Sequence, residues 1–326
     1  MRAFACGSCG QLVFFENTAC LRCGAELGFD PDRRELVTLR GSESGYARCA
    51  NLEAAGCNWL VARAGALCAS CRLTRTRPAD DDREALEQFR VAEAAKRWLL
   101  FELGELGLPV QSWRERDGGL AFELLSSERA PVTTGHADGV ITLDVAESDD
   151  AHREALREQF GEPYRTVLGH FRHEVGHYYW PQLVPDASAR ERCRELFGDE
   201  REDYGAALER HYERGPPADW AQRFVSAYAT THPWEDWAET FAHYLHIWDT
   251  LQTAGAFGVR VRDAQPAPDA DDFRALVDEW LPLTYALNAL NRSMGRDDLY
   301  PFVLPAPVVD KLAFVHQRVT AARRPG

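Results

Sequence analysis

One stretch decides the fold class of this chain, and it reads His173-Glu174-Val175-Gly176-His177. The surrounding sequence has a helical pattern of apolar residues, so we expect the stretch to lie on a helix. Two histidines four residues apart then share one face of that helix, and both imidazoles can reach one metal ion. Glu174 sits where its carboxylate can hold a water molecule on that metal. The stretch therefore predicts a metal site with a base beside it, and the alternative is a surface helix with two incidental histidines.

A third ligand decides between these alternatives. Trp180 and Leu183 occupy the positions at which a metzincin would carry Gly and His, so that class of zinc hydrolase is excluded. A later helical stretch, WEDWAETF at residues 234–241, offers two carboxylates one turn apart, Glu235 and Glu239. Its aromatic residues predict burial, and two buried carboxylates are costly unless they meet a cation or hydrogen-bond donors. A metal site accounts for both carboxylates, and a salt-bridged surface helix is the alternative.

The two carboxylates resemble a pair found in gluzincins such as thermolysin. There the ligand Glu is followed four residues later by an acid that orients a ligand histidine. The resemblance implies that Glu235 is the third ligand and that Glu239 is the hydrogen-bonding partner of His173 or His177. The reverse assignment stays open, because both carboxylates lie on the same face of the helix.

Tyr228 is a candidate for stabilising the negative charge that develops on a substrate carbonyl. Some gluzincins use a Tyr one to two turns before the ligand Glu for this hydrogen bond, and Tyr228 precedes Glu235 by seven residues. Packing in the core is the alternative role of Tyr228. His232 is a weaker candidate for the same hydrogen bond.

Together these residues predict the hydrolysis of a peptide bond. Zinc held by His173, His177 and Glu235 keeps its fourth position for water and lowers the pKa of that water toward roughly 7. Glu174 would take a proton from the water as it attacks an amide carbonyl, and would return the proton to the leaving amine.

The cysteines divide the chain, because eight of the nine lie between Cys6 and Cys71. In a reducing compartment such a group binds metal more often than it forms disulfides. The first quartet consists of two Cys-x2-Cys pairs, each followed by a glycine: Cys6, Cys9, Cys20 and Cys23. Two such pairs place four thiolates around zinc, and a glycine relieves the tight turn after each pair. We therefore expect a structural zinc at this quartet.

The second quartet is less regular, and it comprises Cys49, Cys57, Cys68 and Cys71. The last two form a Cys-x2-Cys pair, whereas seven residues separate the first two, which could instead be buried core thiols. A segment this small cannot fold on apolar burial alone, so zinc would supply folding free energy. Neighbouring arginines keep a second role open, a docking module for a protein or nucleic-acid partner. We therefore expect one catalytic zinc and one or two structural zincs.

The composition of the whole chain limits the classes of function. With 326 residues, 45% of them hydrophobic, the chain can bury a sizeable core, and global disorder is excluded. A net charge of −14 argues against non-specific binding of nucleic acid or anionic membrane by the body as a whole. No apolar run has the length of a membrane helix, and the first residues lack the apolar region of a secretory signal. We expect a cytoplasmic protein without a membrane partner.

The order of elements along the chain predicts an α+β fold. Residues 1–77 are expected to form a tandem zinc-ribbon region, and residues 78–326 a zincin-like, mostly helical domain with a small sheet. The expected elements are a helix at 83–106, strands at 120–125 and 140–145, a helical block at 152–179, a loop at 264–272 and further helices to 323. The second strand could pair with an extended peptide, as an edge strand does in many zincins, or could be an ordinary sheet strand.

Nearly end to end, the chain resembles the bacterial zinc-binding metallopeptidases that carry an N-terminal zinc ribbon. The matching motifs are CLRCG (20–24), CAN (49–51), GCNW (56–59), CASCRL (68–73), TGHADG (134–139), GHFRHEVGHYYW (169–180), HPWEDWAE (232–239), NRSMG (291–295) and YPFVL (300–304). The proposed zinc ligands show no departure from the family pattern. The resemblance implies a zincin-like architecture preceded by zinc ribbons.

Three functions compete at this point. The leading prediction is a zinc metallopeptidase that acts on a peptide or protein substrate. The second is a zinc amidohydrolase that acts on a small peptide-like molecule. The third is an adaptor or regulator that binds a partner through its ribbons and has a catalytically idle zincin body.

Overall fold

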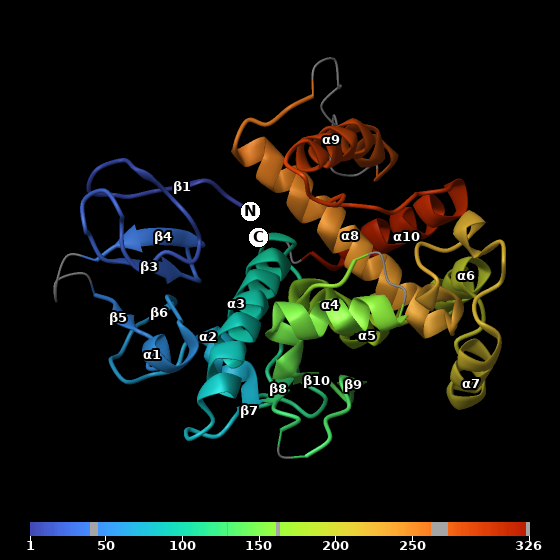
Figure 1. The fold of residues 1–326 in the computed structure, drawn as a ribbon, viewed down its shortest axis with the longest axis horizontal. Helices are drawn as coiled ribbons and strands as arrows, with labels where there is room; N and C mark the ends of the chain where they lie inside the picture. Colours follow the sequence, from blue (N-terminus) through green and yellow to red (C-terminus); the bar gives the residue numbers. More distant parts are fainter. Residues whose placement is uncertain (40–44, 129, 161–163, 262–272, 324–326) are drawn as a thin grey trace. The chain divides into compact units, whose positions relative to one another are not determined.

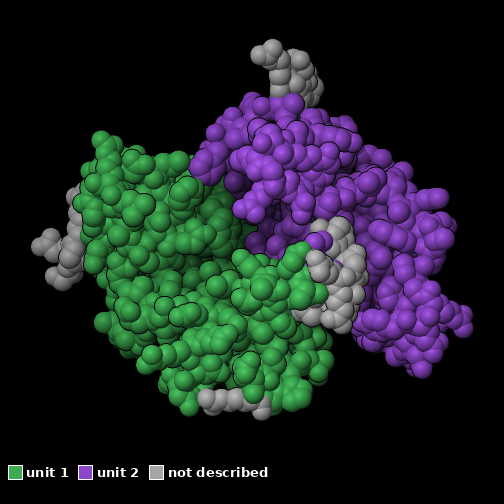
Figure 2. Space-filling model, viewed as in Figure 1, with its two compact units in different colours: residues 1–105, 109–156 green, residues 106–108, 157–326 purple. Residues whose placement is uncertain are grey.

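The computed structural model describes residues 1–39, 45–128, 130–160, 164–261 and 273–323. The chain forms two compact units, coloured separately in Figure 2. Unit 1 comprises residues 1–105 and 109–156, and unit 2 comprises residues 106–108 and 157–326. The predicted α+β class is confirmed, because helices and small sheets both build the fold (Figure 1). Among the described residues, no helix is both long enough and apolar enough to cross a membrane.

Small antiparallel two-stranded sheets and short helices open unit 1. The paired strands are β1 (Phe4–Ala5) with β2 (Leu12–Val13), β3 (Leu27–Asp30) with β4 (Glu35–Thr38), and β5 (Ala47–Arg48) with β6 (Leu60–Val61). The short helices are α1 (Leu52–Ala55) and α2 (Ala69–Leu73). Elements this small bury little apolar surface by themselves, so they depend on a neighbour or on metal.

Helix α3 (Arg83–Glu105) is that neighbour, and it confirms the helix predicted at 83–106. The ring centroid of Phe101 lies 5.1 Å from that of Phe15 and 5.7 Å from that of Phe29. Packed aromatic rings of this kind dominate the stability of a small core. Helix α3 shares this aromatic core with Phe15 and Phe29, and unit 1 accordingly continues to Glu105.

A four-stranded sheet completes unit 1. Its order is β7 (Thr74–Thr76), β8 (Ala121–Leu125), β10 (Val140–Asp144) and β9 (Gly135–Ala137). Strand β10 runs parallel to β8 and antiparallel to β9. The 3-10 helix η2 (Val145–Ser148) and helix α4 (Asp150–Phe160) follow it.

The strands predicted at 120–125 and 140–145 are thus confirmed as β8 and β10. Of the two roles left open for residues 140–144, an edge strand is contradicted over residues 140–142. Residues 140–142 of β10 pair with β8 on one side and with the short strand β9 on the other, and the pairing with β9 stops at Thr142. The hairpin turn uses Asp138 and Gly139, whose φ values are 47° and 83°. Positive φ at both central residues suits a tight two-residue hairpin. Over residues 140–142, β10 is therefore an ordinary sheet strand, the other role left open.

Unit 2 is a cluster of helices. They are α5 (Val167–Leu183), α6 (Ala187–Phe197), α7 (Tyr204–Arg214), η3 (Trp220–Gln222), η4 (Tyr228–Thr230), α8 (Pro233–Ala256), α9 (Phe273–Ser293) and α10 (Ala306–Ala322). The single helical block predicted at 152–179 is wrong, because α4 ends at Phe160 and Thr166 caps the start of α5. The loop predicted at 264–272 lies outside the described residues.

Helices α5 and α8 pack closely, and Gly176 allows it. A methyl group at Gly176 would lie 3.0 Å from the Cα of Ala238 and 3.2 Å from the Cβ of Phe241. The indole of Trp237 donates a hydrogen bond of 2.9 Å to the Gly176 carbonyl. The absent side chain therefore brings the backbone of α5 against α8, the helix that carries Glu235 and Glu239.

A buried ion pair joins α10 to α8. Lys311 Nζ lies 2.6 Å from Asp236 Oδ2, and it also donates to the carbonyl of Arg223 at 2.9 Å. Burial raises the pKa of Asp236 to about 7, although the Lys311 charge opposes that rise. The pair fixes the first turn of α8, in which Glu235 immediately precedes Asp236.

Candidate metal centres

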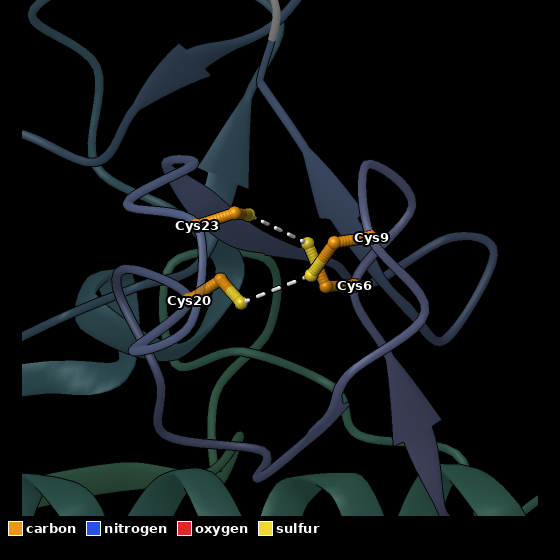
Figure 3. Close-up of side chains that lie close together, drawn as sticks. All are labelled: Cys6, Cys9, Cys20 and Cys23. Carbon is orange, nitrogen blue, oxygen red and sulfur yellow. Dashed lines mark hydrogen bonds between the residues drawn. The ribbon is translucent and has the colours of Figure 1, made fainter.

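The first cysteine quartet converges in unit 1, as Figure 3 shows. The Sγ atoms of Cys6 and Cys23 are 3.7 Å apart, and those of Cys9 and Cys20 are also 3.7 Å apart. All four thiols lie within 4.8 Å of one another. This spacing fits four thiolates around one zinc ion.

The backbone around this quartet favours thiolates. Gly10 and Gly24 both have φ 71°, and each donates its N–H to the first cysteine carbonyl of its pair at 2.8 Å. The backbone N–H groups of Ser8 and then Cys9 lower the pKa of the Cys6 thiol to about 6, against an opposing effect of burial. A lowered pKa is what a metal-binding cysteine requires, because the thiolate is the ligand.

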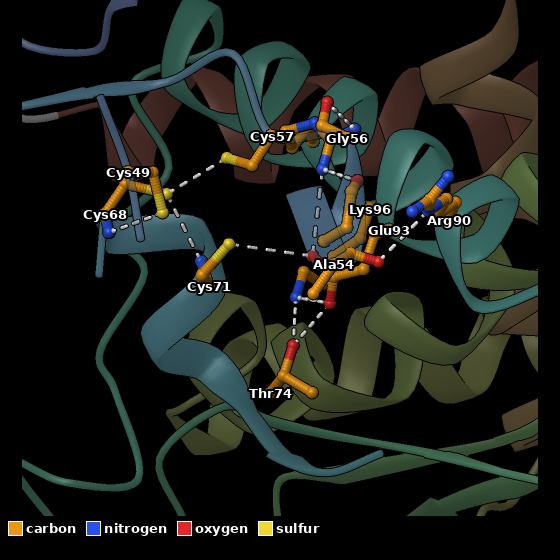
Figure 4. Close-up of polar contacts among 12 residues, drawn as sticks. Cys49, Ala54, Gly56, Cys57, Cys68, Cys71, Thr74, Arg90, Glu93 and Lys96 are labelled. Carbon is orange, nitrogen blue, oxygen red and sulfur yellow. Dashed lines mark hydrogen bonds and ion pairs between the residues drawn. The ribbon is translucent and has the colours of Figure 1, made fainter. Parts of the chain in front are cut away.

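The second quartet also converges, and all four of its cysteines are buried. The Sγ atoms of Cys57 and Cys68 are 3.6 Å apart, and the four thiols lie within 4.8 Å of one another (Figure 4). The N–H of Cys68 donates to Cys49 Sγ at 3.3 Å. Cys49 and Cys57 are thus buried, as core thiols would be, but they face the other two thiols.

Helix α3 lies beside this second quartet with buried charges. Cys71 Sγ donates to Glu93 Oε2 at 3.9 Å, and Lys96 Nζ lies 2.5 Å from Glu93 Oε1 (Figure 4). Arg97 donates to the carbonyls of Ala55 and Gly56, each at 3.2 Å, at the end of α1. A four-thiolate zinc site carries a net negative charge, so neighbouring cations stabilise it.

The third group lies in unit 2 and consists of His173, His177 and Glu235. Glu235 Oε2 lies 3.0 Å from His173 Nε2 and 3.5 Å from His177 Nε2. One ligand atom from each residue lies within 4.8 Å of the others. One carboxylate oxygen therefore lies near the Nε2 atoms of both imidazoles. These three atoms could bind a single metal ion.

Glu239 contacts the other nitrogen of His173. Its Oε1 lies 2.7 Å from His173 Nδ1, and its Oε2 accepts a 2.6 Å hydrogen bond from Ser226 Oγ. Burial would lower the pKa of His173, but Glu235 and Glu239 raise it well above its usual value. The two carboxylates thus demand a positive charge between them, which a proton on His173 or a metal ion can supply.

Glu174 lies on the same helix between the two histidines. Its Oε1 is 3.0 Å from Nε2 of His170, one turn earlier on α5. Burial raises the pKa of Glu174, but His170, and then the charges of His173 and His177, lower it to about 2. The carboxyl is therefore ionised at neutral pH, the state that a base requires.

Tyr228 lies beside these residues. Its ring centroid is 6.0 Å from that of His173, and its hydroxyl interacts with that of Tyr204. Burial, reinforced by the charge of Glu235, raises the pKa of Tyr228, so its hydroxyl keeps its proton. His232, the weaker candidate, instead caps α8 through Nδ1, which accepts the N–H of Trp234 at 3.1 Å.

Three residues beside the His-Glu group were not predicted from the sequence: His170, Tyr204 and Ser226. Each contacts a predicted site residue, and the contacts are His170 to Glu174, Tyr204 to Glu235, and Ser226 to Glu239. His170 carries a usable signal, because it precedes Glu174 by one helical turn. The other two belong to different elements and carry no such periodic signal.

Comparison with known proteins finds two sequence families along the chain. Residues 85–318 match the sequence model of a family described as "Putative zinc-binding metallo-peptidase". The chain belongs to this family. Residues 3–82 match a zinc-ribbon domain. The predicted family and its N-terminal ribbon are therefore confirmed.

Close relatives of this metallopeptidase-family chain occur in mycobacteria. They include the uncharacterized protein Rv2568c of Mycobacterium tuberculosis and the uncharacterized protein Mb2598c of Mycobacterium bovis. Each is 54% identical over 323 residues, which cover 97% of this chain and 94% of the relative. No solved structure matches the chain significantly.

Proposed function

We propose that this member of the metallopeptidase family hydrolyses peptide bonds in a peptide or protein substrate. His173, His177 and Glu235 would hold a catalytic zinc, and Glu174 would act as the general base. The observation that carries the proposal is the position of Glu235 Oε2, 3.0 Å and 3.5 Å from the Nε2 atoms of the two histidines.

The donor set fits zinc by its chemistry. Two imidazole nitrogens and one carboxylate oxygen are a common protein ligand set of catalytic zinc, which leaves a position for water. Glu235 is 3% exposed, and a buried carboxylate of this kind needs a cation. When bound, zinc lowers the pKa of a water molecule toward roughly 7 and polarises a carbonyl oxygen.

The residues of the chain then have separate roles. Glu174, ionised and adjacent to His173, would take the proton of the attacking water and pass it to the leaving amine. Glu239, held by Ser226, would keep His173 oriented through Nδ1, which leaves Nε2 for the metal. Tyr228, which keeps its proton, would donate a hydrogen bond to the oxyanion of the substrate.

The two cysteine quartets would hold structural zincs. Their clustered thiols support metal binding, and the small elements around them need that folding free energy. Thiols persist in a reducing compartment, which supports a cytoplasmic location. A protein or nucleic-acid partner could dock on the ribbons.

Metal removal tests the proposed activity. A mild chelator should remove the metal from the His-Glu site before it removes zinc from the thiolate sites. Cleavage of a diverse peptide mixture should then stop, as measured by mass spectrometry. One equivalent of zinc should restore cleavage, whereas magnesium should not, because it prefers oxygen ligands. Cleavage that survives loss of this metal would refute the proposal. Restored activity on small amides alone would favour the amidohydrolase.

A further inference from the structure

The two oxygens of Glu235 have different partners. Oε2 faces the Nε2 atoms of both histidines, whereas Oε1 accepts a hydrogen bond from the hydroxyl of Tyr204 at 2.9 Å. The phenol is the donor of this bond, because an ionised carboxylate can only accept. One oxygen is therefore available to a metal ion, and the other is already occupied.

The start of α8 holds Tyr204 in this position. His232 caps α8 by accepting the N–H of Trp234 on Nδ1, so its proton resides on Nε2. That nitrogen then donates to the carbonyl of Glu202 at 3.1 Å. The rings of His232 and Tyr204 pack edge to face with centroids 5.3 Å apart. His232, which caps the helix of Glu235, thus also holds the segment that carries Tyr204.

The start of α7 holds Tyr204 from the other side. Tyr204 is the first residue of α7, and the side chain of Asp203 caps that helix by accepting the N–H of Ala206 at 2.7 Å. A capped helix end restricts the backbone of its first residue. Tyr204 is 38% exposed, but the backbone on either side of it is held by these two helix starts, and its hydroxyl reaches Glu235 Oε1 from that fixed position.

We propose that Tyr204 is a positioning residue that makes Glu235 a one-oxygen ligand. By occupying Oε1, it leaves Oε2 alone for the metal and keeps a coordination position open for water. Without the hydroxyl, Oε1 could turn to the metal and take that position. This inference rests on the proposed metal centre at His173, His177 and Glu235.

The test compares Tyr204→Phe with Tyr212→Phe, a matched change at a tyrosine on α7 whose side chain is 65% exposed. Both variants keep the aromatic ring, so packing is preserved and only a hydroxyl is lost. Zinc affinity of the His-Glu site is measured by competition with a chelator. Tyr204→Phe should weaken it by about 10- to 100-fold, as loss of a partner to a ligand does. Tyr212→Phe should match the wild type.

The visible absorption of bound cobalt supplies a second measurement, and a change of fold stability alone would not alter it. With zinc left in the thiolate sites, cobalt is added to the His-Glu site, and its visible absorption reports the coordination number. The Tyr204→Phe band should weaken relative to the wild type and Tyr212→Phe, because a second oxygen raises the coordination number. Equal affinities and equal spectra in all three proteins would overturn the role of Tyr204.

The wild type separates this inference from the proposed function. If the wild type binds metal at the His-Glu site and a His177→Ala variant does not, the metal centre stands, and only the Tyr204 comparison is decisive. If the wild type binds no metal there, the proposed function fails, and the inference about Tyr204 falls with it.

Discussion

Glu174→Gln is expected to lower the rate of peptide hydrolysis by about 10²- to 10⁴-fold, the usual contribution of a general base. The amide has nearly the same shape as the carboxylate, but it cannot accept the proton of the attacking water. Because Glu174 is not among the three converging ligands, the zinc content of the chain should stay unchanged. Turnover of a cleaved peptide and metal content are measured on the same preparation.

The matched control is Glu191→Gln, the same exchange at an exposed position on α6. It should keep the wild-type rate, which shows that the exchange itself is harmless. Full turnover in Glu174→Gln would remove this residue from the mechanism. A loss of turnover together with loss of zinc would instead assign it a role in holding the metal.

Cys71→Ser is expected to release the zinc of the second quartet and to unfold the segment around it. Structural zinc contributes an apparent binding free energy of about 10–16 kcal/mol, more than the whole stability of many domains. Serine is a poor zinc ligand at neutral pH, and Cys71 also contacts the buried Glu93 on α3. Native mass spectrometry should count one zinc fewer, and limited proteolysis should cut between residues 47 and 76.

Cys193→Ser is the control for this variant. Cys193 is buried on α6 outside both quartets, and burial raises the pKa of its thiol to about 12. Its replacement should leave the zinc count unchanged and the segment 47–76 resistant to protease. An unaltered zinc count in Cys71→Ser would mean that the second quartet holds no metal, and that its cysteines are core thiols.

Local spacing explains which features of the fold could be predicted. The spacing of Cys-x2-Cys pairs, and of residues one helical turn apart, fixes which side chains share a face. His173 and His177 share a face of one helix and Glu235 lies on another, so their convergence could be predicted. Helix α3 and strands β8 and β10 could be predicted equally well, because their apolar residues repeat with the period of a helix or of a strand.

Features that depend on distant pairing could not be predicted in this way. The sequence left open whether residues 140–144 form an edge strand, because β9 has only three residues, too few for a strand pattern. Tyr204 lies 31 residues before Glu235 and reaches it only after α7 and α8 have folded. The sharing of an aromatic core between α3 and the ribbons likewise depends on tertiary packing rather than on sequence period.

The central claim, a third metal site separate from the two cysteine quartets, is tested most directly by the zinc content of the purified chain. Wild type and His177→Ala are compared by elemental analysis after both are loaded with zinc and freed of excess. The account predicts three zinc ions per wild-type chain and two per His177→Ala chain. Equal zinc content in the two proteins would contradict it, because the histidine group would then hold no metal.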